Sequence, residues 1–202
     1  SQQWTKQQPI QERNKTMSTY KYFILITICT SAIFSQWEQV INGLGNTSVT
    51  SMFTYADTIM AGTAEGIFKS VDNGESWTDI SGNIGNTSIN DIRGGGGSTS
   101  MWVATEDGAF YTYDHLNYSD YTSTGLTNTD ITYYWFADGA NDINWAVATN
   151  GGGVFTSTDM SGPWASANSG LSGDGFMVND MGGYSDDGDN YAVMATDGGV
   201  YF

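Results

Sequence analysis

The 202-residue sequence carries 22 acidic and six basic side chains, which gives a formal net charge of −16 at pH 7. This charge excludes binding to nucleic acid or to an anionic membrane through a basic surface, because like charges repel one another. The sequence also contains 26 Gly and only two Pro, with many Ser, Thr, Asn and aromatic residues, a composition typical of short β-strands joined by tight turns.

The N-terminal part reads as segments that lie outside the fold. Residues 1–16 precede Met17 and look like an upstream readthrough or another non-native addition. After Met17 come one basic residue, an apolar stretch over Tyr22–Ile33 and small polar residues, the pattern of a secretory signal peptide over 17–35. The apolar stretch is short for a membrane span. An uncleaved anchor or an apolar N-terminal strand is the alternative interpretation.

Removal of this signal peptide leaves a strongly acidic chain. Beyond residue 35 the only basic residues are Lys69 and Arg93, and the single cysteine, Cys29, lies within the apolar stretch. No disulfide can therefore hold the folded part together. We expect a secreted protein, located outside the cell, at the cell surface or in the periplasm, with no membrane insertion after signal cleavage. Its surface suits solubility, a cation or a neutral partner, and no nucleic acid.

The sequence after residue 36 repeats itself. A Gly-apolar-aromatic unit preceded by Gly-Thr or Ala-Thr occurs at residues 65–68, 107–110, 152–155 and 198–201. The copies are 42, 45 and 46 residues apart. A period of about 40 residues that contains several strands is typical of propeller blades. The regular spacing disfavours the alternative, a β-sandwich of unrelated strands.

The first repeat shows the strands of one blade. Alternating and apolar runs predict strands at Ser48–Thr54, Thr58–Thr63, Gly66–Ser70 and Ser76–Ile80. The predicted fold class is therefore all-β, a β-propeller of four-stranded antiparallel blades.

The other repeats extend this reading along the chain. The predicted blades cover about 48–84, 88–126, 130–171 and 175–202, and residues 37–42 form a stray outer strand. We expect an incomplete propeller of about four blades, although the two ends could also pair to close a ring.

A turn motif follows the third strand of the first repeat. The segment from Ser70 to Trp77 matches the pattern S-x-D-x-G-x-x-W at Ser70, Asp72, Gly74 and Trp77. The third repeat keeps Ser157, Asp159 and Trp164.

The second repeat keeps only part of the motif. Asp114 remains, and Tyr121 is the expected substitute for the tryptophan.

The motif and its repeats resemble the Asp box, or bacterial neuraminidase repeat, of sialidase-like, sortilin-like and photosystem-assembly-factor-like propellers. The resemblance implies structural roles: the Asp accepts backbone N–H groups of the turn, the Gly permits a positive φ, and the Trp packs into the blade. We therefore predict that none of these residues is catalytic. Sialidases grip a carboxylate with three arginines, and Arg93 alone cannot form such a site.

Two functions follow from this resemblance. The first is a non-catalytic propeller that serves as an interaction or carbohydrate-binding module of an exported or cell-surface protein, with an extracellular glycan or protein as its partner. The alternative is a fragment of an Asp-box glycoside hydrolase of the xyloglucan-cleaving type, which needs two carboxylates on either side of a groove. The sequence does not single out such a pair.

Aromatic residues form one candidate ligand site. Tyr133 and Trp135 share one face of a predicted strand and could stack on sugar rings. Packing between blades explains them equally well.

Metal sites are weakly indicated. Asp186, Asp187 and Asp189 could offer oxygen ligands to calcium, but they lack the EF-hand spacing and also fit a solvated hairpin turn. No other cofactor is expected. The single histidine, His115, excludes a multi-histidine metal site and is expected to lie exposed in a turn.

Overall fold

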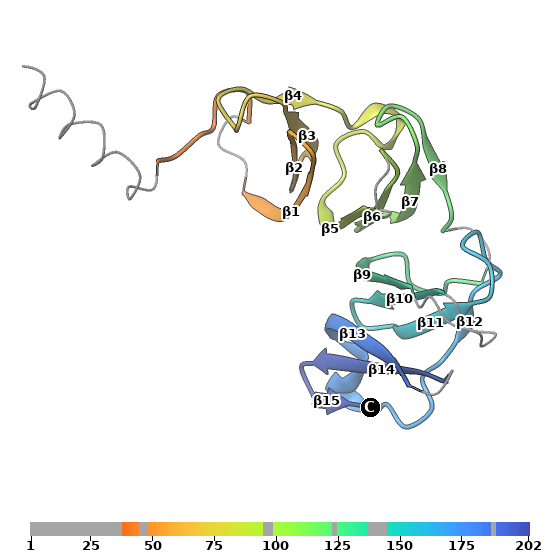
Figure 1. Cartoon of the computed structure of the whole chain (residues 1–202). Coiled ribbons are helices and arrows are strands. Elements are labelled where there is room, and N and C mark those ends of the chain that lie inside the picture. The colour runs from red at the N-terminus through yellow and green to blue at the C-terminus, as the bar shows by residue number, and fades with distance from the viewer. Residues whose placement is uncertain (1–37, 45–47, 95–98, 123–124, 137–144, 187–188) are drawn as a thin grey trace, which may run out of the picture. The chain divides into compact units, whose positions relative to one another are not determined.

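The structure is a computed structural model that describes residues 38–44, 48–94, 99–122, 125–136, 145–186 and 189–202 (Figure 1). The chain divides into two compact units, and the second, Val40–Phe202, contains all of the described strands. The predicted signal peptide over 17–35 lies outside the described residues.

The described strands form four antiparallel sheets that follow one another along the chain. We call these sheets blades 1 to 4. The strands of blades 1 and 2 are β1 (Val49–Tyr55), β2 (Thr58–Thr63), β3 (Gly66–Ser70), β4 (Thr78–Asp79), β5 (Ile89–Gly94), β6 (Met101–Thr105), β7 (Gly108–Thr112) and β8 (Tyr118–Asp120). Those of blades 3 and 4 are β9 (Ile131–Phe136), β10 (Trp145–Thr149), β11 (Gly153–Ser157), β12 (Ala165–Ser166), β13 (Val178–Asp186), β14 (Asp189–Thr196) and β15 (Gly199–Tyr201).

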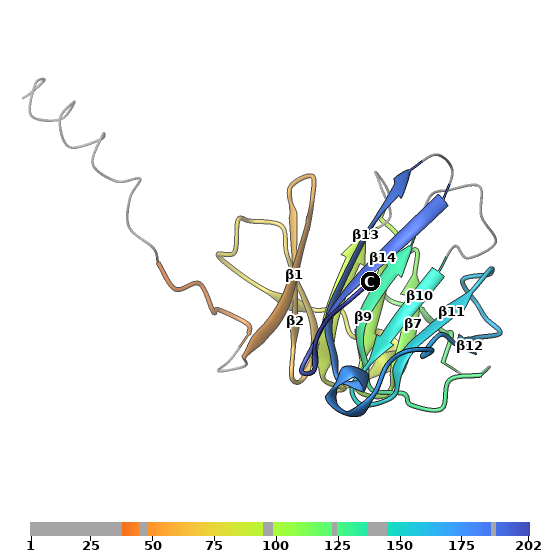
Figure 2. The same ribbon diagram turned by 90° about the horizontal axis from the view of Figure 1, so that it is seen from below.

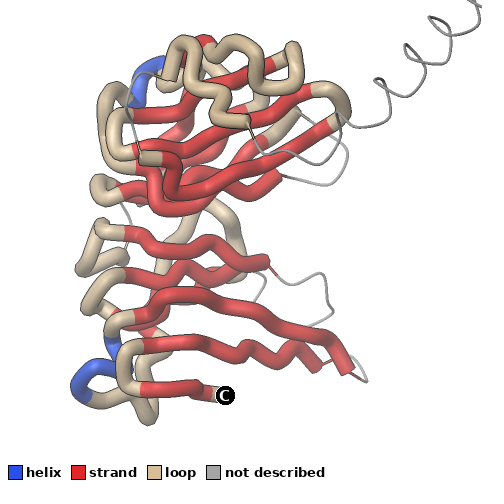
Figure 3. The backbone as a smooth tube through the Cα atoms, turned by 90° about the vertical axis from the view of Figure 1, so that its left-hand side faces the viewer, coloured by secondary structure: helices blue, strands red, loops and turns tan. Residues whose placement is uncertain are grey.

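Blades 1 to 3 have four strands each, and blade 4 has three in the described residues. Two short 3₁₀ turns, η1 (Gly82–Ile84) and η2 (Gly173–Phe176), lie in the connections between blades (Figure 3). The first strands β1, β5, β9 and β13 contact one another in that order, so that successive sheets lie side by side (Figure 2). This arrangement confirms the predicted all-β architecture of propeller blades.

Each blade packs its neighbours through two apolar faces. We call the face toward the next blade in the chain the forward face, and the face toward the preceding blade the rear face. Between blades 1 and 2, Met60 and Ile67 of the forward face meet Ile89, Ile92 and Val103 of the rear face. All five are at most 3% exposed.

The same scheme joins the later blades. Trp102 and Ala104 of blade 2 pack on Tyr134 and Val147 of blade 3, with the Trp102 and Tyr134 rings stacked at 4.7 Å. Blades 3 and 4 meet through a smaller cluster, in which Ala148 and its neighbours contact Val178 and Met181.

A bulge at the start of each first strand adds a polar link between blades. The register shifts after the first residue of β1, β5, β9 and β13, which leaves one extra residue there. In the first three blades this residue donates a hydrogen bond to the carbonyl of the residue that starts the next blade. The pairs are Thr50 Oγ1 to Ile89 at 2.5 Å, Asn90 Nδ2 to Ile131 at 2.8 Å and Thr132 Oγ1 to Val178 at 2.6 Å.

The stray outer strand expected at 37–42 is not found in its described part. Residues 38–41 are irregular and a turn begins at Asn42. The segment is instead held by Trp77, whose backbone N–H donates to Asn42 O at 2.9 Å and whose indole N–H donates to Val40 O at 3.2 Å. These two hydrogen bonds from Trp77 anchor the segment, but they do not form a β-ladder.

Truncation of Val147 should weaken the fold because its side chain is fully buried between blades 2 and 3. We expect Val147→Ala to lower the free energy of unfolding by about 2 kcal/mol, from lost burial and the cavity left behind. The matched control Val71→Ala removes a side chain that is 67% exposed and should change it by less than about 0.5 kcal/mol. Urea unfolding followed by tryptophan fluorescence measures both, and equal effects would contradict the assignment of this core.

Candidate functional site

The turn motif of blade 1 is a closed set of hydrogen bonds between β3 and β4. Ser70 Oγ donates to Asp72 Oδ1 at 2.8 Å and accepts from the Gly74 backbone N–H at 2.8 Å. Asp72 also accepts from the Ser76 backbone N–H at 2.9 Å and from the Ser76 hydroxyl. Bonds from Ser76 and Ser70 lower the pKa of Asp72. Gly74 has φ +91°, a conformation that favours glycine.

The corresponding turns of blades 2 and 3 bind their carboxylates in the same way. Asp114 accepts backbone N–H bonds from Asn117 at 2.8 Å and Leu116 at 2.9 Å and a third bond from the Asn117 amide, and these bonds hold its pKa far below the ordinary value. Asp159 accepts from the Ser161 hydroxyl at 2.7 Å and from its backbone N–H at 2.8 Å, which also lowers its pKa. All three carboxylates are thus engaged in shaping turns.

The aromatic position of the motif in blade 2 belongs to Tyr118, and the expectation of Tyr121 was wrong. Strand register decides this, because Phe68 pairs with Asp79 in blade 1 and Phe110 pairs with Asp120 in blade 2. Counting back two residues from these partners gives Trp77 and Tyr118.

The side chain of Tyr118 acts as the tryptophans do. Its hydroxyl donates to Ile80 O of the preceding blade at 2.9 Å, and burial raises its pKa. Trp164 Nε1 likewise donates to Tyr121 O at 3.0 Å. The Val40 carbonyl accepts the hydrogen bond of Trp77, and the carbonyls of Ile80 and Tyr121 are the corresponding acceptors for the later blades.

His115 is buried, contrary to the expected exposed position. Its backbone has φ +60°, like Asn73 at the same place in the blade 1 turn, and its N–H donates to Thr112 Oγ1 at 3.0 Å. The residue is 9% exposed, and its Nε2 has no hydrogen-bond partner among the described residues. Burial lowers its pKa. This histidine is therefore a part of the packed turn.

Each first strand contributes one polar side chain to a row that crosses the four blades, and this side chain belongs to the residue that follows the bulge. We call it the inner row: Ser51, Asp91, Tyr133 and Asp180, which pair with Gly62, Ala104, Ala148 and Ala195 of the second strands. The shared register brings residues about 40 positions apart in the sequence onto neighbouring blades.

The centre of the inner row is an interaction among Asp91, Arg93 and Tyr133. Arg93 Nε donates to Asp91 Oδ2 at 2.8 Å, and its guanidinium carbon lies 4.0 Å from the centre of the Tyr133 ring. Ser51 Oγ donates to the other oxygen of Asp91 at 3.3 Å. Burial alone would lower the pKa of Arg93, but the bond and charge of Asp91 outweigh it and raise the pKa. Arg93 is 43% exposed, so it can still reach a ligand.

The predicted stacking residues lie beside this centre. Tyr133 and Trp135 are both half-buried and pack with the cluster between blades 3 and 4. One face of Tyr133 is covered by Arg93, and the Trp135 ring lies so near Gly183 that a Cβ there would be 2.4 Å from it. Both aromatics therefore pack between blades, and their binding to sugars stays a prediction.

The calcium candidates lie at the end of one hairpin. Asp186 ends β13 and Asp189 begins β14, and the two are paired across the strands, while Asp187 lies outside the described residues. Within the part of the chain that the structure describes, no three His, Cys, Asp or Glu side chains gather closely enough to hold a metal ion.

Comparison with solved structures shows what the fold is similar to. The computationally designed Ika4 protein matches 83% of this chain over 99% of its own, with 13% identity and a TM-score of 0.54. Two extracellular domains from B. thetaiotaomicron, of the two-component systems BT3049 and BT4673, match with 18% and 16% identity, each with a TM-score of 0.58. These matches cover 82% and 81% of this chain but only 26% and 22% of those domains.

At these identities the likeness shows the fold alone, four β-propeller blades. The sequence matches no protein-family model and no curated protein. Among the described residues, no helix has the length and apolar character to cross a membrane.

Acid should destabilise the protein through the turn carboxylates. A carboxyl with a lowered folded pKa contributes stability above its unfolded pKa, about 3.9, and loses it as the pH falls through the folded pKa. We expect the melting temperature to fall as the pH drops from about 5 to about 2. Asp114→Asn should lower the melting temperature at neutral pH and reduce this acid dependence.

The matched control is Asp57→Asn, at the exposed turn between β1 and β2. Scanning calorimetry over this pH range measures the melting temperatures of all three proteins. Asp57→Asn should show the same fall in melting temperature with acid as the unchanged protein. An Asp114→Asn profile identical to that of the control would show that the turn bonds contribute nothing.

Proposed function

We propose that this chain is a secreted, non-catalytic propeller of the Asp-box kind that serves as an interaction or carbohydrate-binding module of an exported or cell-surface protein. The observation that carries the proposal is the centre of the inner row, where Asp91, Arg93 and Tyr133 are held together next to Ser51. Such a set offers hydrogen-bond donors, acceptors and an aromatic edge to one ligand, and three blades position it.

The turn motifs support an Asp-box relationship and a structural role for their carboxylates. Asp72, Asp114 and Asp159 each accept several turn hydrogen bonds, and these bonds lower their pKa values. A general acid of a glycosidase needs the opposite shift, a raised pKa. These three residues are therefore poor candidates for catalysis.

Charge restricts the ligand class. A net charge of −16 disfavours anionic ligands, because the protein's field repels them as they approach. A neutral glycan avoids this cost, and its hydroxyl groups can bond both to a carboxylate and to a guanidinium. We therefore place neutral extracellular oligosaccharides first among ligands and an extracellular protein second.

A glycoside hydrolase remains the second candidate because the inner row holds two carboxylates near one cation. Asp91 and Asp180 both interact electrostatically with Arg93 although they come from different blades. If they act on either side of a glycosidic bond, one serves as acid and the other as base or nucleophile.

Binding to neutral oligosaccharides tests the proposal directly. Isothermal titration of the full chain with xyloglucan, cellulose and β-glucan oligosaccharides should show binding to at least one of them. Tyr133→Leu should then weaken that binding at least about tenfold, which corresponds to about 1.4 kcal/mol. The control Tyr113→Leu changes a tyrosine that is 66% exposed in a turn outside the inner row, and it should bind normally.

The same oligosaccharides separate the two candidate functions. The binding module releases no product on prolonged incubation. Reducing-end release that is lost in both Asp91→Asn and Asp180→Asn would favour the hydrolase. Equal binding by Tyr133→Leu and by its control would reject the inner row as the binding site.

A further inference from the structure

The forward face of blade 4 is uncovered, although the same positions are buried in the other blades. Val200 is 76% exposed, whereas the equivalent residues Ile67, Ala109 and Val154 are at most 4% exposed. Strand register defines this equivalence, because each of these residues pairs with the second-strand residue that faces the inner row. Blade 4 therefore presents an apolar surface of the type that receives a following blade.

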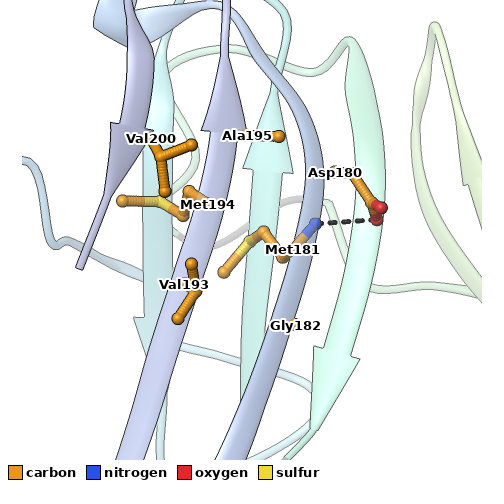
Figure 4. Close-up of a pocket in the computed structure, with 7 residues that line it drawn as sticks. All are labelled: Asp180, Met181, Gly182, Val193, Met194, Ala195 and Val200. Carbon is orange, nitrogen blue, oxygen red and sulfur yellow. Dashed lines mark hydrogen bonds between the residues drawn. The ribbon is translucent and has the colours of Figure 1, made fainter.

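A shallow hollow of about 250 Å³ lies on this surface (Figure 4). Its lining includes five residues of this face, Asp180, Gly182, Val193, Ala195 and Val200, and the intervening residues Met181 and Met194, which belong to the cluster with blade 3. It is mostly apolar, with Asp180 of the inner row at its rim.

The rear face of blade 1 is uncovered in the complementary way. Met52 is 60% exposed, whereas its equivalents Ile92, Tyr134 and Met181 are at most 4% exposed. Val49 is 43% exposed, whereas Ile89, at the same position in blade 2, is fully buried. Blade 1 therefore presents the type of surface that covers a preceding blade.

Polar groups match across the two surfaces as well. The bulge residue of blade 4 is Asn179, which corresponds to the donors Thr50, Asn90 and Thr132 of the other blades. Its amide group carries two N–H donors, and one of these bonds Asp197 at 2.8 Å. The acceptor that corresponds to the Ile89 carbonyl is the carbonyl of Val49.

Strand pairing adds a third match. Strand β15 lacks a fourth-strand neighbour in the described residues, which leaves an exposed sheet edge. The Val40 carbonyl accepts from Trp77 as the Ile80 carbonyl accepts from Tyr118, so Glu38 and Gln39 correspond in sequence to the fourth strand, Thr78–Asp79. One end of the chain thus carries the element that the other end can pair with.

We propose that two copies of this chain associate head to tail, with the rear face of blade 1 of one copy covering the forward face of blade 4 of the other. The interface repeats the contact that already joins the blades within one chain. The interface is heterologous, because it joins two different surfaces. Two copies therefore form a closed ring only if each uses both its blade 1 rear face and its blade 4 forward face. Because each copy carries a net charge of −16, added salt strengthens the association by screening their repulsion.

Sedimentation of the full 202-residue chain over a range of concentrations tests this proposal. We expect at least a twofold increase in mass over the single chain, with a dissociation constant that falls as salt is added. Val200→Asp and Met52→Asp should each raise that constant by roughly 10- to 100-fold, because each places an unpaired carboxylate in the contact. The control Val71→Asp changes a valine that is 67% exposed in a turn away from both faces, and it should associate normally.

A mixture of the two interface variants tests the head-to-tail geometry. Val200→Asp keeps an intact blade 1 face, and Met52→Asp keeps an intact blade 4 face, so together they should form a 1:1 complex although each alone does not. Circular dichroism confirms that each variant is folded. A chain that stays monomeric at every concentration and salt overturns the proposal, as does a mixture of folded variants that forms no complex.

Discussion

The fold depends on covering both apolar faces of each sheet with a neighbouring sheet. A single four-stranded blade cannot do this alone, because the two faces of blade 2, for example, carry Val103 and Trp102, and both side chains must leave water. Close approach is possible because the forward face has small residues where the rear face has large ones. A Cβ on Gly62, for example, would lie 2.5 Å from Ile89 Cγ2. The repeats are therefore complementary surfaces as well as similar sequences.

The same packing creates the candidate site. Because the blades stack in register, the residue after each bulge falls on the inner row, and residues from separate repeats meet there. Arg93, one of the two basic residues beyond residue 35, is fixed between Asp91 and the Tyr133 ring. This contact among a carboxylate, a cation and an aromatic ring is not a consequence of the repeated sequence pattern. This difference between blades is where a specific function can reside.

Much of the fold could be read from the sequence. The Gly-aromatic repeats placed the second and third strands of blade 1 at the residues that the structure shows, since tight turns after Thr63 and Ser70 leave little freedom. The degraded motif of blade 2 could not be placed in this way. Its turn around Asp114 is one residue shorter, so counting from the intact motif missed Tyr118, and only the pairing of Phe110 with Asp120 reveals it. The inner row, apart from Tyr133, could not be predicted from the sequence either, because its position depends on bulges that no single residue marks.

Packing between blades is the claim on which the rest of the account depends. A double-mutant cycle between Trp102 of blade 2 and Tyr134 of blade 3 measures it most directly. Their rings lie 4.7 Å apart at 20°. With Leu at each position, alone and together, urea unfolding should give a coupling free energy of about 1 kcal/mol. Purely additive effects would contradict the packing of these two blades.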